Sequence, residues 1–226
     1  MVENTQGEIM KTVNITNGEY FNGFFEKQYG AVGVPFNEAM MSGEAPESVY
    51  DEKFIRLRAA FHGVSEHEYK NKMSAFSHFI KNAVQYDEAV LWFGDDTFCQ
   101  LNMITVLALM ESAGFCGKVY SVITDDMTFE IKRPKSEIFL GTWREVYRGV
   151  LQLKKRIFFG DEILDNAVEL YFDFLDDNGV LATFIKENSH MSDTELIIAL
   201  LKKSQSYGLS DIQASELIKK YKKYVH

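Results

Sequence analysis

Acids and amides are the candidate functional residues of this chain of 226 residues, because they follow segments typical of β-strands. Three such segments end in polar groups, and these groups are Asn17-Gly18-Glu19, Asp95-Asp96 and Asp125-Asp126. In an open α/β sheet the ligand binds beyond the carboxyl ends of the strands. We therefore expect up to five carboxylates and an amide to line one crevice of the folded protein.

An acidic crevice of this kind suits two types of chemistry. Carboxylate oxygens bind a hard cation such as Mg²⁺ or Mn²⁺, which in turn holds a phosphorylated ligand. Like charges also raise the pKa of a carboxyl group, which can then act as a general acid or base. We predict Asp95 and Asp96 as catalytic residues, and Asp96 and Asp125 as metal ligands. The alternative for the first pair is a helix N-cap, a position that Asp favours but that needs only one of the two.

Further candidates for ligand binding flank these acids. Asn17, Gly18 and Glu19 precede a predicted helix, where a turn can cradle a phosphate, although a purely structural turn is the alternative. Glu19 would repel a phosphate unless a cation lies between them. Gln100 follows the first acid pair, and its alternative role is to close a capping box. We expect Asn102 to face outward.

Charge and motifs exclude several classes of function. The chain has 24 Lys and Arg against 33 Asp and Glu, a net charge of −9. Because phosphate backbones are bound by clustered Lys and Arg, a nucleic-acid partner is not expected. The signatures of the commonest hydrolases, nucleotidases and proteases are absent. No stretch approaches the ~18 apolar residues of a membrane span, and we expect no membrane partner.

The two cysteines, Cys99 and Cys116, have no metal-ligand spacing. We expect them to fill space in the core of a cytoplasmic protein, where thiols stay reduced. Arg56, Arg58 and His62 could together bind an anion over the crevice, with a solvated helix face as the alternative.

The elements that must position these residues alternate between strand and helix over the first 155 residues. Strands are expected at 12–16, 32–36, 89–93, 118–124 and, weakly, 138–140. Helices are expected at 19–29, 48–61, from 65 to about 80, at 97–113 and from 142 onward. This alternation predicts an α/β fold with a mostly parallel sheet flanked by helices, Rossmann-like and three-layered. Right-handed crossovers then place the strand-to-helix turns on one edge of the sheet.

The domain organisation is predicted as a flexible leader (1–11), an α/β domain (12–158) and an all-helical C-terminal subdomain (161–226). Capping boxes, in which a side chain at each end of the first turn satisfies the other's backbone amide, are expected at 65–68, 97–100, 142–145, 192–195 and 210–213. Asp161 is expected to cap the first tail helix. The last 27 residues carry six Lys and two acids, and their two short helices are similar in spacing to a helix-turn-helix.

Three blocks of the sequence resemble a known family. They are 14–18, 34–40 with Gly43, and 91–102. They look like the conserved blocks of the "domain of unknown function 1835" family, an uncharacterised bacterial family, over roughly residues 12–150. The tail resembles the C-terminal extension often seen there. The resemblance implies the same fold and strand-end loops, brings no activity with it, and points to Asn37 and Glu38 as further ligand-binding residues. Glu19 stands where some relatives have Asp.

Three functions follow as hypotheses. The first is an acidic small-ligand crevice that supports metal-assisted transfer or hydrolysis on a polar or phosphorylated small molecule. The second is a non-catalytic metabolite-binding or regulatory module. The third is a DNA- or protein-binding adaptor that acts through the helical tail. The sequence leaves open whether the protein is an enzyme, and what its oligomeric state is.

Overall fold

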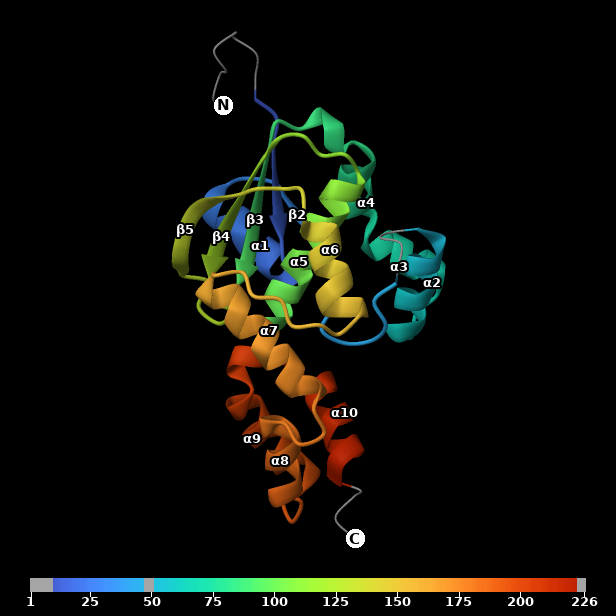
Figure 1. Cartoon of the computed structure of the whole chain (residues 1–226), viewed down its shortest axis with the longest axis vertical. Helices are drawn as coiled ribbons and strands as arrows, with labels where there is room; N and C mark the ends of the chain where they lie inside the picture. Colours follow the sequence, from blue (N-terminus) through green and yellow to red (C-terminus); the bar gives the residue numbers. More distant parts are fainter. Residues whose placement is uncertain (1–9, 47–50, 223–226) are drawn as a thin grey trace.

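The computed structural model describes residues 10–46 and 51–222. Most of the predicted leader, residues 1–9, lies outside the described residues, as does the start of the helix predicted at 48–61. The chain folds into a sheet flanked by helices, with a group of helices below the sheet (Figure 1). Among the described residues, no helix combines the length and the apolar character that crossing a bilayer requires.

The sheet has five strands in the order β2-β1-β3-β4-β5. The first four, which are all parallel, are β1 (Thr12–Thr16), β2 (Gly33–Pro35), β3 (Glu88–Gly94) and β4 (Lys118–Thr124). The fifth, β5 (Ile131–Ile138), runs antiparallel to β4. The predicted mostly parallel α/β fold is therefore confirmed.

The weak strand predicted at 138–140 is wrong in its position, because the edge strand is formed by the residues before it. The side chains of β5 are mostly exposed and several are charged. An edge strand can be held by backbone hydrogen bonds to a single neighbour while its side chains face water. It therefore shows no apolar pattern from which a strand could be predicted.

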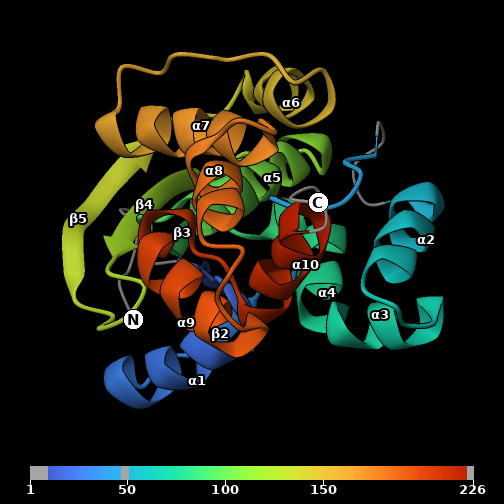
Figure 2. The same ribbon diagram turned by 90° about the horizontal axis from the view of Figure 1, so that it is seen from below.

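Helices cover both faces of the sheet (Figure 2). One face is covered by α1 (Gly18–Tyr29), whose Phe25 and Tyr29 rings pack on Trp92 of β3 with centroids 5.0 and 4.9 Å apart. The opposite face is covered by α5 (Thr97–Ser112). Thirteen of the 16 residues of α5 are buried, because the sheet lies on one side of it and α6 and α7 pack on the other.

Three helices and a short 3₁₀ turn connect β2 to β3. They are α2 (Glu52–Phe61), α3 (Glu66–Lys72), α4 (Ser74–Lys81) and η1 (Ala83–Gln85). The predicted capping box at Ser65 and Glu68 is confirmed. The single helix expected after Ser65 is interrupted at Met73, which leaves the helical conformation between α3 and α4.

The predicted capping box at 142–145 is not formed. The short helix α6 (Trp143–Tyr147) and the π-turn η2 (Arg148–Gln152) follow β5, and Thr142 makes no side-chain cap. The carboxylate of Glu111, at the end of α5, accepts hydrogen bonds from the free backbone amides of Gly141, Trp143 and Arg144 instead. An acid that is distant in the sequence thus accepts the hydrogen bonds of the free backbone amides at the start of α6.

The C-terminal segment is helical, as predicted. Its elements are α7 (Glu162–Leu175), α8 (Val180–Glu187), α9 (Asp193–Lys203), η3 (Gln205–Tyr207) and α10 (Asp211–Tyr221). The predicted caps at Asp161, Ser192 and Ser210 are confirmed. These helices lie beyond the carboxyl ends of the parallel strands, and α7 packs against α5 (Figure 1).

Candidate functional site

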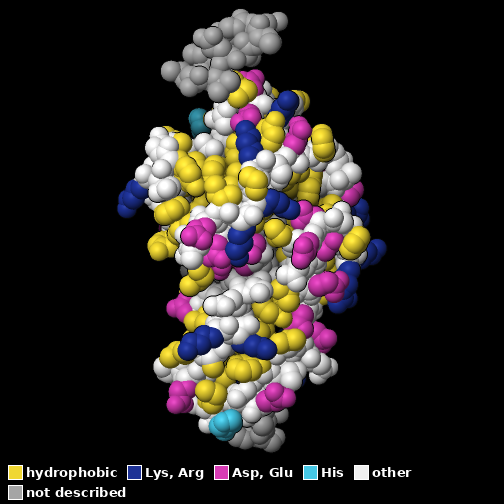
Figure 3. Space-filling model, turned by 90° about the vertical axis from the view of Figure 1, so that its left-hand side faces the viewer, with side chains coloured by type: hydrophobic (Ala, Val, Ile, Leu, Met, Phe, Trp, Pro, Cys, Tyr) yellow, Lys and Arg dark blue, Asp and Glu magenta, His cyan; other side chains and the backbone are white. Residues whose placement is uncertain are grey.

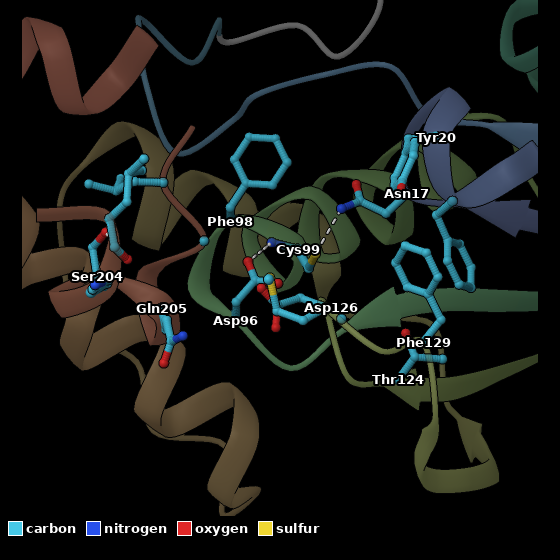
Figure 4. Close-up of a pocket in the computed structure, with 17 residues that line it drawn as sticks. Asn17, Tyr20, Asp96, Phe98, Cys99, Thr124, Asp126, Phe129, Ser204 and Gln205 are labelled. Atoms are coloured by element: carbon cyan, nitrogen blue, oxygen red, sulfur yellow. Dashed lines mark hydrogen bonds between the residues drawn. The ribbon is translucent and has the colours of Figure 1, made fainter. Parts of the chain in front are cut away.

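The strands β1 and β3 meet at the point where the chain reverses its direction across the sheet. After β1 the chain turns to α1 on one face and returns as β2, whereas after β3 it turns to α5 on the other face and returns as β4. The loops after the two strands therefore diverge, and ligands of open α/β sheets bind in the resulting crevice. A cavity of about 490 Å³ opens at this point (Figure 4).

The cavity has a polar floor, an aromatic wall and a lid formed by the helical subdomain. The floor consists of the side chains that follow three strands, namely Asn17, Asp96, Cys99, Thr124 and Asp126. The aromatic side chains are those of Tyr20, Phe21, Phe98 and Phe129. Residues from the end of α9 to the start of α10, Gln205 and Gly208 among them, close the cavity on the remaining side.

Asp96 is the most deeply buried acid of the floor, with 3% of its surface exposed. It is the N-cap of α5, and its Oδ1 accepts a hydrogen bond of 2.8 Å from the backbone amide of Cys99. Burial raises the pKa of Asp96 to about 6, and the nearby charge of Asp126 adds to the effect. The prediction of a capping box that starts at Thr97 is wrong, because the N-cap residue is Asp96 and Thr97 is already the first residue of the helix.

A chain of hydrogen bonds runs from the core of α5 to the floor of the cavity. The Asn102 amide donates to Oδ1 of Asn17 at 2.9 Å, and the Asn17 amide donates to the Cys99 sulfur at 2.8 Å. Burial raises the pKa of the Cys99 thiol well above its usual range, and the charge of Asp96 raises it further. Cys99 therefore stays protonated at neutral pH and is unsuited to act as a nucleophile.

The prediction that Asn102 faces outward is wrong. Its side chain is fully buried, donates to the backbone oxygen of Glu38 at 2.7 Å and accepts from the amide of Met40 at 3.0 Å. It thereby ties the loop after β2 to the cavity floor. The sequence does contain a signal, since an Asn within an otherwise apolar helix needs hydrogen-bond partners if all sides of that helix are buried.

Of the ligand-binding residues predicted from the sequence, only Asn17 lines the cavity. Gly18 begins α1 in the left-handed conformation, with φ of +82°. The Asn37 amide donates to the Glu19 carboxylate at 3.0 Å, which holds the loops after β1 and β2 together. The amide of Gln100 donates to the Gly94 carbonyl at 2.5 Å below the floor. Its Oε1 atom is buried without a partner in the part of the chain that the structure describes.

Glu38 lies in a separate, closed polar cluster. Its carboxylate accepts hydrogen bonds from the Arg58 guanidinium at 2.6 Å and from the Tyr69 hydroxyl at 2.5 Å, and His62 lies 3.2 Å away. Burial alone would raise the pKa of Glu38, but the bonds from His62 and Arg58 outweigh it and lower the pKa to about 2. Arg58 is fully buried in this pair, so the anion site predicted for it, Arg56 and His62 is not formed.

The second acid pair forms a partly buried cluster with Asp95 next to the cavity. Carboxylate oxygens of Asp95, Asp125 and Asp126 lie within 4.8 Å of one another. The Lys132 ammonium of β5 contacts two of them, Asp95 at 2.7 Å and Asp125 at 2.8 Å. Acidic side chains gather around a basic one at this level of the molecule (Figure 3). The predicted metal ligands Asp96 and Asp125 line one small cavity together with Asp95, Asp126 and Lys132. Asp96 is nevertheless not part of the close group of carboxylate oxygens, and the Lys132 ammonium already contacts two members of that group.

Sequence analysis did not identify several residues of the site. Phe129 lies in the turn between β4 and β5, and Gln205 and Gly208 lie at least 81 residues along the chain from the ends of the strands that they face. No local pattern indicates these contacts, because they are created when the helical subdomain packs on the strand ends. A weak signal exists for Phe129 alone, as an apolar residue within a polar turn.

Asp96 should make the stability of the protein depend on pH. Its pKa is about 6 in the folded protein against an ordinary value of 3.8. The folded state therefore binds more protons between these values, and stability falls as the pH rises through them. Asp96→Asn keeps the cap and removes the charge. At about pH 8 we expect its free energy of unfolding to exceed that of the native protein by up to about 3 kcal/mol, and its melting temperature to be higher. Below about pH 4 the variant and the native protein should melt at the same temperature.

The matched control is Asp125→Asn. The hydrogen bond from Lys132 lowers the pKa of Asp125, so its stabilising contribution is present at neutral pH and is lost in acid. Calorimetric melts over a pH series should therefore show that, at about pH 8, Asp96→Asn is more stable than the native protein and Asp125→Asn is less stable. An Asp96→Asn variant that is less stable than the native protein at that pH would contradict this, because it would show that other interactions compensate the cost of burying the Asp96 charge.

Gly208 should be needed where the subdomain meets Asp96. Its φ is +68°, and a Cβ atom there would lie 2.1 Å from Oδ1 of Asp96. Gly63 has a similar φ of +65° but open space around it. We expect Gly63→Ala to cost about 1–2 kcal/mol from the backbone alone, and Gly208→Ala to cost clearly more. If the two variants lose equal amounts of melting temperature, Gly208 does not lie in close contact with the Asp96 carboxylate.

Comparison with family models, curated proteins and solved structures finds no match to this chain. The resemblance to the "domain of unknown function 1835" family therefore stays a prediction, and the case for a function is built on the cavity itself.

Proposed function

We propose that this protein binds a small organic molecule in the cavity at the β1–β3 switch point, with the polar end of the ligand on Asp96. The observation that carries the proposal is a carboxyl group that is 97% buried, faces this cavity and has no ion-pair partner among residues 10–46 and 51–222. The position is also the one at which open α/β sheets bind their ligands.

The cost of burying Asp96 supports a functional role. A buried carboxylate with a raised pKa destabilises the folded protein at neutral pH. Helix capping does not require this cost, because Asn caps as well as Asp. Strongly perturbed acids of this kind cluster at binding and catalytic sites, where a ligand supplies the missing partner.

The neighbours of Asp96 suit it to exchange a proton with a bound ligand. A group with a pKa of about 6 is close to the range in which general acids and bases work best. The Asn102–Asn17–Cys99 chain of hydrogen bonds fixes the floor around it. A regulatory binding module and an enzyme would use the same carboxylate, and turnover of the ligand distinguishes the two.

The helical subdomain should sense the ligand, because it forms one side of the cavity. Thr97 donates to the backbone oxygen of Ser206 at 3.2 Å, which links the start of α5 to η3. A ligand that fills the cavity contacts the sheet and the subdomain at once. Binding therefore favours the docked arrangement of the subdomain, since a ligand stabilises the state that it binds.

A thermal-melt screen of the full chain tests the proposal. The panel should contain nucleotides, sugar phosphates, amino acids and amines. A ligand at ~100 times its dissociation constant adds ~2.7 kcal/mol to the free energy of unfolding, and each kcal/mol raises the melting temperature by about 2–4 °C in a chain of this size. We expect at least one class to produce such a shift.

The matched variants are Gln205→Trp and Gln205→Ala. The Gln205 side chain is exposed at the mouth of the cavity (Figure 4). An indole there should block the cavity and abolish the shift, whereas the alanine variant should keep it. A ligand that shifts both variants alike binds elsewhere, and a panel without any shift contradicts the proposal.

Metal-assisted transfer or hydrolysis is the second candidate, and one observation favours it, the three neighbouring carboxylates of Asp95, Asp125 and Asp126. Lys132 opposes it, because its ammonium already compensates two of these charges. We expect Mg²⁺ or Mn²⁺ at about 1 mM to raise the melting temperature of Lys132→Met but not of the native protein. A metal-dependent shift of the native protein that Asp125→Asn removes would favour this second function.

A further inference from the structure

We propose that the ligand of the cavity is a small organic cation, an amine or protonated heterocycle with an apolar body, held between the Asp96 and Asp126 carboxylates and an aromatic wall. This inference rests on the proposed function and names the ligand class of the same site. It departs from the phosphorylated ligand expected from the sequence.

The charge of the cavity is the first argument. Asp96 and Asp126 lie side by side in its centre (Figure 4). Burial raises the pKa of Asp126, and the charges of Asp125 and Asp95 raise it further. Lys132 is engaged by Asp95 and Asp125 on the outer side. Lys202 is exposed on α9 at the rim, so its ammonium is free to stay in water. A phosphate would be repelled here, whereas an ammonium group would relieve the repulsion between the two carboxylates.

The aromatic wall is the second and independent argument. The Phe129 ring packs against Tyr20 at 5.7 Å, Phe21 at 5.0 Å and Phe24 at 4.8 Å between ring centroids. Tyr20, Phe21 and Phe129 line the same cavity as the two acids. Aromatic faces attract ammonium groups, and this attraction grows when water is excluded. Aromatic rings together with carboxylates therefore form a site that favours cations over neutral molecules.

The backbone of Phe129 is the third argument. Its φ is +60°, one of two positive values among the described residues other than glycine. A bulky residue in this region of backbone space is strained, and such strain is concentrated at ligand sites.

The charged and titratable groups around Asp96 come from every element packed against it. They are Tyr20 of α1, Cys99 of α5, Asp95 after β3, Asp125 and Asp126 after β4, Lys132 of β5 and Lys202 of α9. Asp96 gains its charge as the pH rises through about 6, and Asp126 acts in the same direction because its pKa is also raised. A cation should therefore bind more tightly as the pH rises, and a neutral analogue should not.

Three probes of nearly equal shape test the inference with the full chain. They are 2-phenylethylammonium, 2-phenylethanol and 3-phenylpropanoate, and their dissociation constants are measured by NMR titration of the ligand signals. We expect the ammonium probe to bind at least about tenfold more tightly than the alcohol at about pH 8. The carboxylate probe should bind most weakly. The preference for the ammonium probe should become smaller towards about pH 5, where Asp96 is mostly protonated.

Two variants separate the contributions of the acid and the ring. Asp96→Asn keeps the helix cap. It should reduce the preference for the ammonium probe over the alcohol at about pH 8, and should remove most of the change in that preference between about pH 5 and pH 8. Phe129→Leu keeps an apolar side chain but removes the aromatic ring. It should lower the affinity for the ammonium probe more than the affinity for the alcohol. Circular dichroism melts of both variants confirm that they are folded before binding is compared.

The outcomes distinguish this inference from the function on which it rests. If the alcohol or the carboxylate binds as tightly as the ammonium probe, the ligand class is wrong while binding in the cavity stands. If no probe binds but the screen finds an anionic or neutral ligand that Gln205→Trp blocks, the class is again wrong, whereas an amine blocked in the same way supports it. If neither the probes nor the screen give binding, both proposals are overturned.

Discussion

The burial of the Asp96 carboxylate at the start of α5 is the constraint on which the site depends. Asp96 caps the central helix, whose sides are covered by the sheet and by α6 and α7. The same carboxylate lies under Gly208 of the helical subdomain, which approaches so closely that a Cβ atom would overlap it. The Asp96 carboxylate thus lies where the start of α5, the strand ends and the helical subdomain come together. None of these elements supplies a cationic partner for it among the described residues.

Glu38 and Asp96, two of the buried acids among the described residues, show how their surroundings decide their roles. Glu38 is enclosed with Arg58, Tyr69 and His62, so that its charge is fully compensated and its pKa is lowered to about 2. Such a pair holds the loop after β2 in place, and breaking it by removing one partner would leave an uncompensated buried charge. Asp96 accepts hydrogen bonds but has no cationic partner among the described residues, so that burial raises its pKa. The first arrangement is typical of structural ion pairs and the second of ligand sites.

The position of the cavity and its contents support each other. Divergence of the chain at the β1–β3 switch point creates a crevice in any doubly wound sheet. In this protein the crevice is deepened by the helical subdomain and narrowed by aromatic rings from α1 and from the turn after β4. The result is a site with an apolar side and an acidic side. On that acidic side Lys132 pairs with Asp95 and Asp125, whereas the carboxylates of Asp96 and Asp126 line the cavity without an ion pair among the described residues.

The sequence by itself determined the elements and the edge at which the polar residues gather. Buried parallel strands are continuous apolar runs, and caps are local, so β3, β4 and the starts of α3, α7, α9 and α10 were predictable. Asp96 and Asn17 were found because strand ends are marked by local punctuation. Only the tertiary structure decided that Asp125 pairs with Lys132, that Asn102 turns inward, and that Phe129 and Gly208 complete the cavity. These outcomes depend on contacts between residues far apart in the chain, and such contacts leave no periodic or local signal in a single sequence.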